Sequence, residues 1–203
     1  MTDHPRPDDL TGLVLAGGAS KRMGRDKAFL QLGGHPLIQI VVERMAEVCQ
    51  EVIIVADDLA AYAGFGVPVV VDRFRGVGVL GGLHAGLAAA SHDLTLAVGC
   101  DMPFLKPQLL RAFATWAERY DVTLLRHQGF LEPLHAAYRR TCLSPIEAAI
   151  RAGERRIVSF FPQVRVRTVT AEDVAPFDPH LESFRNLNTP EAWQAAKEAW
   201  PNR

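Results

Sequence analysis

Short apolar runs alternate with stretches of helical spacing through the first part of this chain. The runs are rich in β-branched residues and are bounded by glycine, proline or aspartate, as buried strands are. They cover residues 13–15, 52–55, 67–71 and 94–98. Between them, apolar residues recur three and four positions apart, which predicts helices. These stretches cover residues 37–48, 80–90 and 109–116.

This alternation predicts βαβ units, because neighbouring parallel strands must be joined by a crossover, usually a helix. We therefore expect an α/β fold of three layers, with a mainly parallel sheet and helices on both faces, in the manner of a Rossmann-like fold. In such sheets ligands bind at the carboxyl ends of the strands. Functional residues should then follow strands directly.

The order loosens after Tyr120 and predicts a mixed sheet. Residues 122–125 and 134–138 look like strands, and residues 126–133 between them suggest a hairpin or a wide loop at the edge of the sheet. Residues 164–169 read as one further strand. An antiparallel pair at the edge would make the parallel sheet mixed.

Two helices are predicted in the last third of the chain from their capping residues. A helix over residues 144–152 should have Ser144 as its N-cap and stop at Gly153. The final helix should open after Asn188 or Thr189, since either side chain can accept hydrogen bonds from the first turn.

Length and composition predict one soluble domain. The 203 residues suit a single domain, with residues 1–9 as a flexible N-terminal tail. A net charge of −1 gives no general attraction to nucleic acid, and no apolar run is long enough to span a membrane. Three widely spaced cysteines and a polar N-terminus without a signal-peptide pattern favour the cytoplasm.

A glycine-rich, basic loop follows the first predicted strand. Leu15-Ala16-Gly17-Gly18 leads into a segment with four cationic side chains. Glycines let backbone N–H groups approach an anion, and Lys and Arg neutralise phosphate charge. The loop matches neither the P-loop nor the dinucleotide-binding pattern. The alternative is a plain turn with a solvated basic surface.

Two acidic residues also follow predicted strands. Asp101 comes directly after a buried strand and could hold Mg²⁺ while triphosphate oxygens and water complete the octahedron. Alternatively it caps the helix after Pro103. Asp72 precedes a glycine-rich stretch and an alanine-rich helix whose N-terminus could face an anion, although tight helix packing would also explain the glycines.

Four motifs resemble those of the molybdenum cofactor guanylyltransferases, and together they span most of the chain. The loop from Leu15 to Lys27 is similar to the signature loop of that family, and Cys100-Asp101-Met102-Pro103-x-Leu105 is similar to its acidic motif. The two others are Glu132-Pro133-Leu134-His135-Ala136 and Asn186-x-Asn188-Thr189-Pro190.

The resemblance implies a nucleotidyltransferase fold and a role for each matching residue. GTP would bind to Leu15, Ala16, Gly17 and Gly18, with Asp72 also in contact with the nucleotide. Lys27 would contact the triphosphate, Arg22 would lie near the pyrophosphate, and Asp101 would be the Mg²⁺ ligand. Arg22, Lys27 and Asp101 are thus the expected catalytic residues, and Mg²⁺ the expected cofactor.

The resemblance also implies that Asn186 and Asn188 help to place the acceptor, molybdenum-molybdopterin, although Asn188 could equally be a helix cap. The implied reaction joins GMP from GTP to that acceptor and releases pyrophosphate. Proteins that deliver molybdopterin or mature molybdoenzymes become candidate partners.

Two positions depart from the family pattern. Val79 stands where the family has proline, and Ala56-Asp57-Asp58 stands where an asparagine commonly contacts the base. Asp57 or Asp58 could accept hydrogen bonds from guanine, or could cap the next short helix. Rival functions are cytidylyl transfer, sugar-phosphate nucleotidyl transfer and GTP binding without catalysis.

Overall fold

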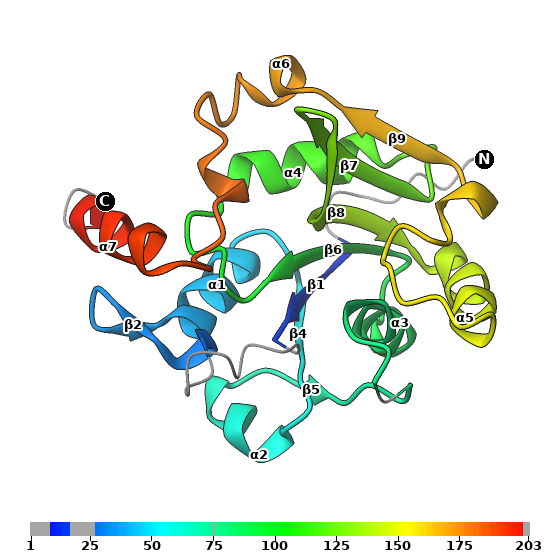
Figure 1. Cartoon of the computed structure of the whole chain (residues 1–203), viewed down its shortest axis with the longest axis horizontal. Coiled ribbons are helices and arrows are strands. Elements are labelled where there is room, and N and C mark those ends of the chain that lie inside the picture. The colour runs from blue at the N-terminus through cyan, green and yellow to red at the C-terminus, as the bar shows by residue number, and fades with distance from the viewer. Residues whose placement is uncertain (1–8, 17–26, 75, 201–203) are drawn as a thin grey trace.

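A computed structural model describes residues 9–16, 27–74 and 76–200 (Figure 1). In this part of the chain, seven strands form one sheet in the order β5-β4-β1-β6-β8-β7-β9. Their bounds are β1 Leu10–Leu15, β4 Glu51–Val55, β5 Val69–Val70, β6 Leu94–Gly99, β7 Val122–His127, β8 Phe130–Arg139 and β9 Val166–Val169. β1 pairs in parallel with β4 and β6, and β8 is antiparallel to β6 and β7. The expected mixed sheet is confirmed.

Helices cover both faces of the sheet, as Figure 1 shows. These helices are α1 Leu37–Ala46, α3 Val79–Ala89, α4 Pro107–Trp116 and α5 Leu143–Arg151. Side chains alternate along each strand, so Val14 of β1 joins the core beneath α1 and α4, while Leu13 joins the core beneath α3 and α5. The expected three layers are therefore confirmed. Among the described residues, no helix is long and apolar enough to cross a bilayer.

The remaining elements are short or lie at the ends of the fold. A two-stranded hairpin precedes α1, small helices connect the strands, and a longer helix ends the described chain. They are η2 Lys27–Phe29, β2 Gln31–Leu32, β3 His35–Pro36, α2 Leu59–Tyr62, η3 Ala63–Phe65, η4 Arg140–Cys142, η5 Phe161–Gln163, α6 Ala171–Val174, η6 Glu182–Phe184 and α7 Pro190–Ala199.

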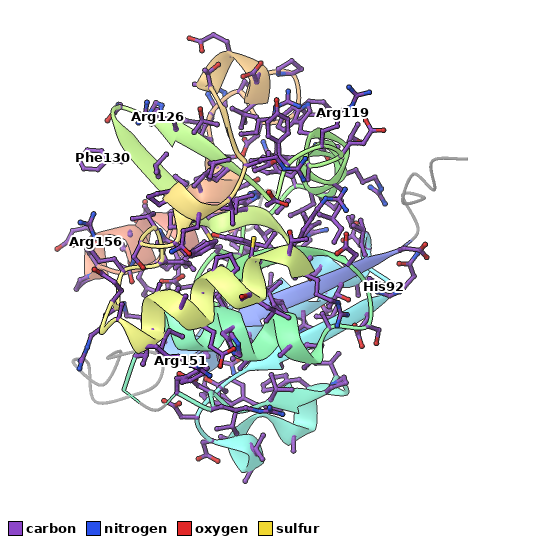
Figure 2. The ribbon with its side chains drawn as sticks, turned by 90° about the vertical axis from the view of Figure 1, so that its right-hand side faces the viewer. His92, Arg119, Arg126, Phe130, Arg151 and Arg156 are labelled. Atoms are coloured by element: carbon purple, nitrogen blue, oxygen red, sulfur yellow. The ribbon has the colours of Figure 1, made fainter. Side chains whose placement is uncertain are left out.

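The predicted hairpin is present and its turn is tight, but its predicted place at the edge of the sheet is wrong, because β8 also pairs with β6 and β7 also pairs with β9. Gln128 and Gly129 connect β7 to β8 with positive φ angles of 50° and 83°, and Phe130, which is 73% exposed, projects from the hairpin (Figure 2). Further along, the register shifts between Leu124 and Leu125, which forms a bulge on β8. The bulge explains why the sequence between the two runs suggested a wide loop.

One predicted helix cap is wrong and another is correct. Ser144 does not cap α5, because the helix begins at Leu143 directly after η4 and so includes Ser144 in its first turn. Gly153 ends this region with a φ of 85°, as expected. Thr189, not Asn188, caps α7, and its side chain accepts a hydrogen bond from Ala192 N at 3.1 Å.

Helix α7 packs on the turn between β2 and β3. Gly33 has a φ of 59°, and a Cβ there would stand 1.7 Å from Trp200 Nε1. A buried cluster that contains Leu32, Phe104 and Leu187 lies beneath this contact. This packing holds the residues just before α7 against the edge of the sheet where β6 ends.

A buried carboxylate at the start of β7 should control acid stability. Asp121 accepts hydrogen bonds from Arg165 N at 2.9 Å, Arg165 Nε at 3.0 Å and Thr141 Oγ1 at 2.8 Å. These bonds, led by the Arg165 side chain, lower the pKa of Asp121 to about 2. The ionised form is therefore favoured in the folded state, and its stabilisation should be lost as the pH falls from about 4 to about 2.

Asp121→Asn is expected to reduce the free energy of unfolding at neutral pH by about 2 kcal/mol. The difference from the wild type should shrink as the pH falls below 4, and urea unfolding across this range measures it. Asp93→Asn is the control, because this exposed carboxylate pairs with Arg139 on the surface. An equal loss in both variants would contradict the role of Asp121.

Candidate active site

The carboxyl ends of β1, β4 and β6 meet at one edge of the sheet. Leu15, the last residue of β1, pairs with Val55 and with Gly99. Its carbonyl accepts a hydrogen bond from Cys100 N at 3.1 Å, and Ala16 N donates to Val55 O at 2.8 Å. The backbone that leads into the glycine-rich loop is thus fixed between two neighbouring strands.

Asp101 lies on the turn that follows β6. Its Oδ1 is 2.8 Å from the place where a Cβ on Gly99 would stand, so glycine provides the space that the carboxylate occupies. The next helix, α4, begins only at Pro107 and has Lys106 as its N-cap. The alternative that Asp101 caps that helix is therefore wrong, and its carboxylate serves another purpose.

The charge environment of Asp101 combines burial with a nearby cation. Burial raises the pKa of the half-buried Asp101 carboxyl, while the positive charge of Lys27 lowers it. Lys27 is the first residue of η2, at the far end of the loop that begins at Ala16 after β1. The fold therefore brings both ends of this loop close to the end of β6. A carboxylate and an ammonium group therefore share the carboxyl edge of the sheet.

Asn188 joins this pair from the C-terminal part of the chain. Lys27 Nζ donates a hydrogen bond to Asn188 Oδ1 at 2.6 Å. The neighbouring Leu187 N donates to the backbone carbonyl of Asp101 at 3.0 Å. Three residues singled out from the sequence, Lys27, Asp101 and Asn188, are thus brought together.

The segment before Asn188 is held to the loop after Asp101 by polar contacts that are buried or partly buried. Lys106 Nζ forms ion pairs with Asp178 at 2.8 Å and with Glu182 at 3.2 Å. Lys106 N donates to Ser183 Oγ at 3.1 Å, and Ser183 N donates to Asp178 Oδ2 at 2.7 Å. These contacts couple the position of the C-terminal segment to that of Asp101. No sequence motif indicated them.

Asn186, the other predicted acceptor residue, is half-buried in the same segment. Its Oδ1 is buried and has no hydrogen-bond partner among the described residues. A buried acceptor without a partner is uncommon and suits a position where a ligand completes the site. The structure does not bring Asn186 into a hydrogen bond with Lys27 or Asp101 within the described residues.

Asp72 lies against the first turn of α3. Its Oδ1 accepts a hydrogen bond from Phe74 N at 2.7 Å, and a Cβ on Gly81 would stand 2.2 Å from its Oδ2. Burial, and to a lesser degree the charge of Asp57, raises the pKa of the Asp72 carboxyl. The close approach requires glycine at position 81. The tight packing at Gly81 therefore also sets the position of the Asp72 carboxylate.

Gly81→Ala is expected to reduce the free energy of unfolding by about 1–3 kcal/mol, because the added methyl group overlaps the Asp72 carboxylate. Gly82→Ala is the matched control. Its Cβ would meet only Val55 at 3.6 Å and Leu15 at 3.8 Å, and alanine favours a helix. Thermal unfolding of both variants checks this, and equal melting temperatures would contradict it.

The single carboxylate of Asp101 at this edge suits a metal ion that is shared with a ligand. Among the described residues, no three His, Cys, Asp or Glu side chains gather to hold a metal ion. A single carboxylate such as Asp101 fits Mg²⁺ only if phosphate oxygens and water supply the other positions, which is the usual arrangement for this ion.

The chain matches proteins of known family. The model of the MobA-like NTP transferase domain matches residues 12–168. A probable molybdenum cofactor guanylyltransferase of Pelotomaculum thermopropionicum is 40% identical over 89% of this chain and 88% of that protein. This chain belongs to the molybdenum cofactor guanylyltransferase family. A molybdenum cofactor guanylyltransferase of Desulfosudis oleivorans is 37% identical over 95% of this chain and 96% of that protein.

A solved structure of the same family has the same fold. The molybdopterin-guanine dinucleotide biosynthesis protein A of Archaeoglobus fulgidus superposes with a TM-score of 0.83 and 28% sequence identity. The match covers 95% of this chain and all of that one. The predicted nucleotidyltransferase fold is thereby confirmed.

Three predicted residues of the guanylyltransferase signature loop, Gly17, Gly18 and Arg22, lie outside the described residues. The described residues on either side of them, Ala16 and Lys27, lie at the same edge of the sheet as Asp101. The roles that the resemblance implies for the three remain predictions.

The two departures from the guanylyltransferase pattern have simple structural consequences. Val79 is the first residue of α3, a position where proline is also favourable, and it packs against Leu15, Val55 and Ala85. Asp58 caps α2 by accepting hydrogen bonds from Ala60 N and Ala61 N. Asp57 is exposed and does not cap that helix, so it stays available for base recognition.

Proposed function

We propose that this protein transfers GMP from GTP to molybdenum-molybdopterin and releases pyrophosphate. The terminal phosphate of molybdopterin attacks the α-phosphorus of GTP, a new phosphorus–oxygen bond forms, and the bond to the β-phosphate breaks. The observation that best supports this is the meeting of Lys27, Asp101 and Asn188 at the carboxyl ends of β1 and β6. This arrangement brings together a cation that can bind phosphate, Lys27, a carboxylate, Asp101, and a residue expected on the acceptor side, Asn188.

The residues of the chain act mainly by placing groups and neutralising charge. The Lys27 ammonium would donate hydrogen bonds to the triphosphate and stabilise the negative charge that grows on the leaving pyrophosphate. Backbone N–H groups of the loop after Ala16, with Arg22, would hold the same phosphates. The attacking phosphate is already ionised at neutral pH, so no general base is required.

We propose Asp101 as the residue that holds Mg²⁺. When bound, the ion would neutralise the negative charge of the phosphate groups of GTP. The half-buried carboxylate, with space provided by Gly99, supports this assignment. We further place the reaction in the cytoplasm, where the thiols of Cys49, Cys100 and Cys142 would stay reduced.

Two measurements test the proposed function. Thermal unfolding with Mg²⁺ and each of GTP, CTP, ATP and UTP should show the largest stabilisation with GTP, about 2.7 kcal/mol at 100 times its Kd. Incubation with molybdenum-loaded molybdopterin, GTP and Mg²⁺ should then release pyrophosphate in step with formation of the guanine dinucleotide. Equal stabilisation by all four nucleotides, or release of pyrophosphate without acceptor dependence, would contradict the proposal.

A further inference from the structure

The contact between Lys27 and Asn188 points to a role for Asn188 on the nucleotide side of the site. We propose that Asn188 is a positioning residue for Lys27, which it holds beside Asp101 where the β- and γ-phosphates of the nucleotide bind. This inference rests on the proposed function and adds to it. Asn188 acts through Lys27, and this role is additional to the contact with the acceptor that the resemblance implies.

The backbone on both sides of Asn188 is fixed, which sets the direction of its side chain. On one side Leu187 is 2% exposed, and its N–H donates to the Asp101 carbonyl at 3.0 Å. On the other side Thr189 caps α7 through Ala192 N. A side chain held in this way can aim Oδ1 at the Lys27 ammonium at 2.6 Å without a large loss of conformational freedom on binding.

An amide suits this task because it is a neutral acceptor. The lysine ammonium has three N–H donors, and Asn188 uses one, which leaves two for phosphate oxygens. A carboxylate at this position would cancel the positive charge that the phosphates require. Asparagine therefore orients the cation and preserves its charge.

Because Asp101 lies nearby, the neutral side chain of Asn188 has a second effect on Lys27. The Lys27 and Asp101 charges already act on each other across the site. A direct ion pair between them would occupy the carboxylate proposed to hold Mg²⁺ and the ammonium proposed to hold phosphate. The bond to Asn188 holds the ammonium in place without such a pair, so both charges stay available to the nucleotide.

The experiment measures the Kd for GTP by titration calorimetry in Mg²⁺ and without any acceptor. The set is wild type, Asn188→Ala, Lys27→Ala and the double variant. Asn188→Ala should weaken GTP binding roughly tenfold, as expected for loss of a hydrogen bond to a charged group. In the Lys27→Ala background, the same substitution should change the Kd by less than about twofold, because coupled residues are not additive.

Three comparisons separate positioning from a general structural effect. The Kd for GMP, which lacks the β- and γ-phosphates, should be the same for wild type and Asn188→Ala. Asn188→Asp should weaken GTP binding more than Asn188→Ala, because it cancels the Lys27 charge. Thr189→Ala, which removes the cap of α7, should lower the melting temperature and leave the Kd for GTP within about twofold of the wild-type value.

The possible outcomes distinguish this inference from the proposed function. An unchanged Kd in Asn188→Ala, or an equal loss in the presence and absence of Lys27, would overturn the positioning role while wild-type GTP binding still supports the function. If another nucleotide binds in place of GTP, the guanylyl assignment fails, and the same set of variants is titrated with that nucleotide. If no nucleoside triphosphate binds the wild type, both are overturned.

Discussion

Asp101→Ala is expected to lower the rate of pyrophosphate release by at least about 10³-fold, because the variant loses the carboxylate proposed to hold Mg²⁺. The fold should survive. Burial raises the pKa of the Asp101 carboxyl, so the folded protein holds this charge at a cost and gains nothing in stability from it. The melting temperature should therefore stay equal or rise. Steady-state turnover and circular dichroism of the same sample measure both effects.

The control for Asp101→Ala is Asp93→Ala, which removes a carboxylate just before the opposite end of the same strand, β6. That variant should keep a near-normal rate. Near-normal turnover in Asp101→Ala would contradict the metal assignment, and a large fall in its melting temperature would show that Asp101 is structural.

Asp101 also predicts how the rate of pyrophosphate release depends on pH. In the absence of Mg²⁺, a raised pKa means that Asp101 takes up a proton at a higher pH than an ordinary aspartate does. A proton on this carboxylate competes with Mg²⁺, so the affinity for Mg²⁺ and the rate at limiting Mg²⁺ should fall on the acid side, and Asp101→Asn should imitate the protonated form at every pH.

Lys27→Ala is expected to lower the rate by about 10² or more, by analogy with the removal of one donor that stabilises charge in the transition state. The variant loses the ammonium that lies near Asp101 and that donates to Asn188 at 2.6 Å. Lys27→Arg should recover only part of the rate, because the guanidinium keeps the charge in a larger, planar group. Turnover at saturating GTP measures the effect.

Lys197→Ala is the matched control for Lys27→Ala. Lys197 is an exposed lysine on α7 whose ammonium lies 5.5 Å from the centre of the Trp193 ring. Its removal should leave turnover within about twofold of wild type, as for most surface substitutions. If Lys27→Ala lost no more activity than Lys197→Ala, charge neutralisation by Lys27 would be excluded as a main source of catalysis.

Local patterns along the chain were enough to predict the strands and helices that build the sheet. The spacing of apolar residues along strands and helices indicates which side chains are buried. Burial of apolar side chains is the main favourable contribution to the free energy of folding. The boundaries were less accurate where two elements run together. The Ser144 cap failed because η4 continues into α5, and the bulge on β8 escaped notice because it depends on pairing with β7.

Part of the candidate site could likewise be predicted from the sequence, and part could not. The loop after Leu15, Asp72 and Asp101 could be predicted from the sequence, since each follows a strand and a parallel sheet brings strand ends together. The bond between Lys27 and Asn188 could not, because it joins residues 161 positions apart in the sequence. The contacts of Lys106 with Asp178 and Glu182 likewise depend on how the C-terminal segment crosses the edge of the sheet.

The sequence by itself therefore determined the layers of the fold, the family and the chemical character of the site. These follow from residue types and short spacings, which are properties of neighbouring positions. Only the tertiary structure decided that Thr189 caps the last helix, that Asn188 contacts Lys27, and that Leu187 is bonded to Asp101. The physical reason is that each such contact depends on the packing of distant segments, which no local pattern encodes.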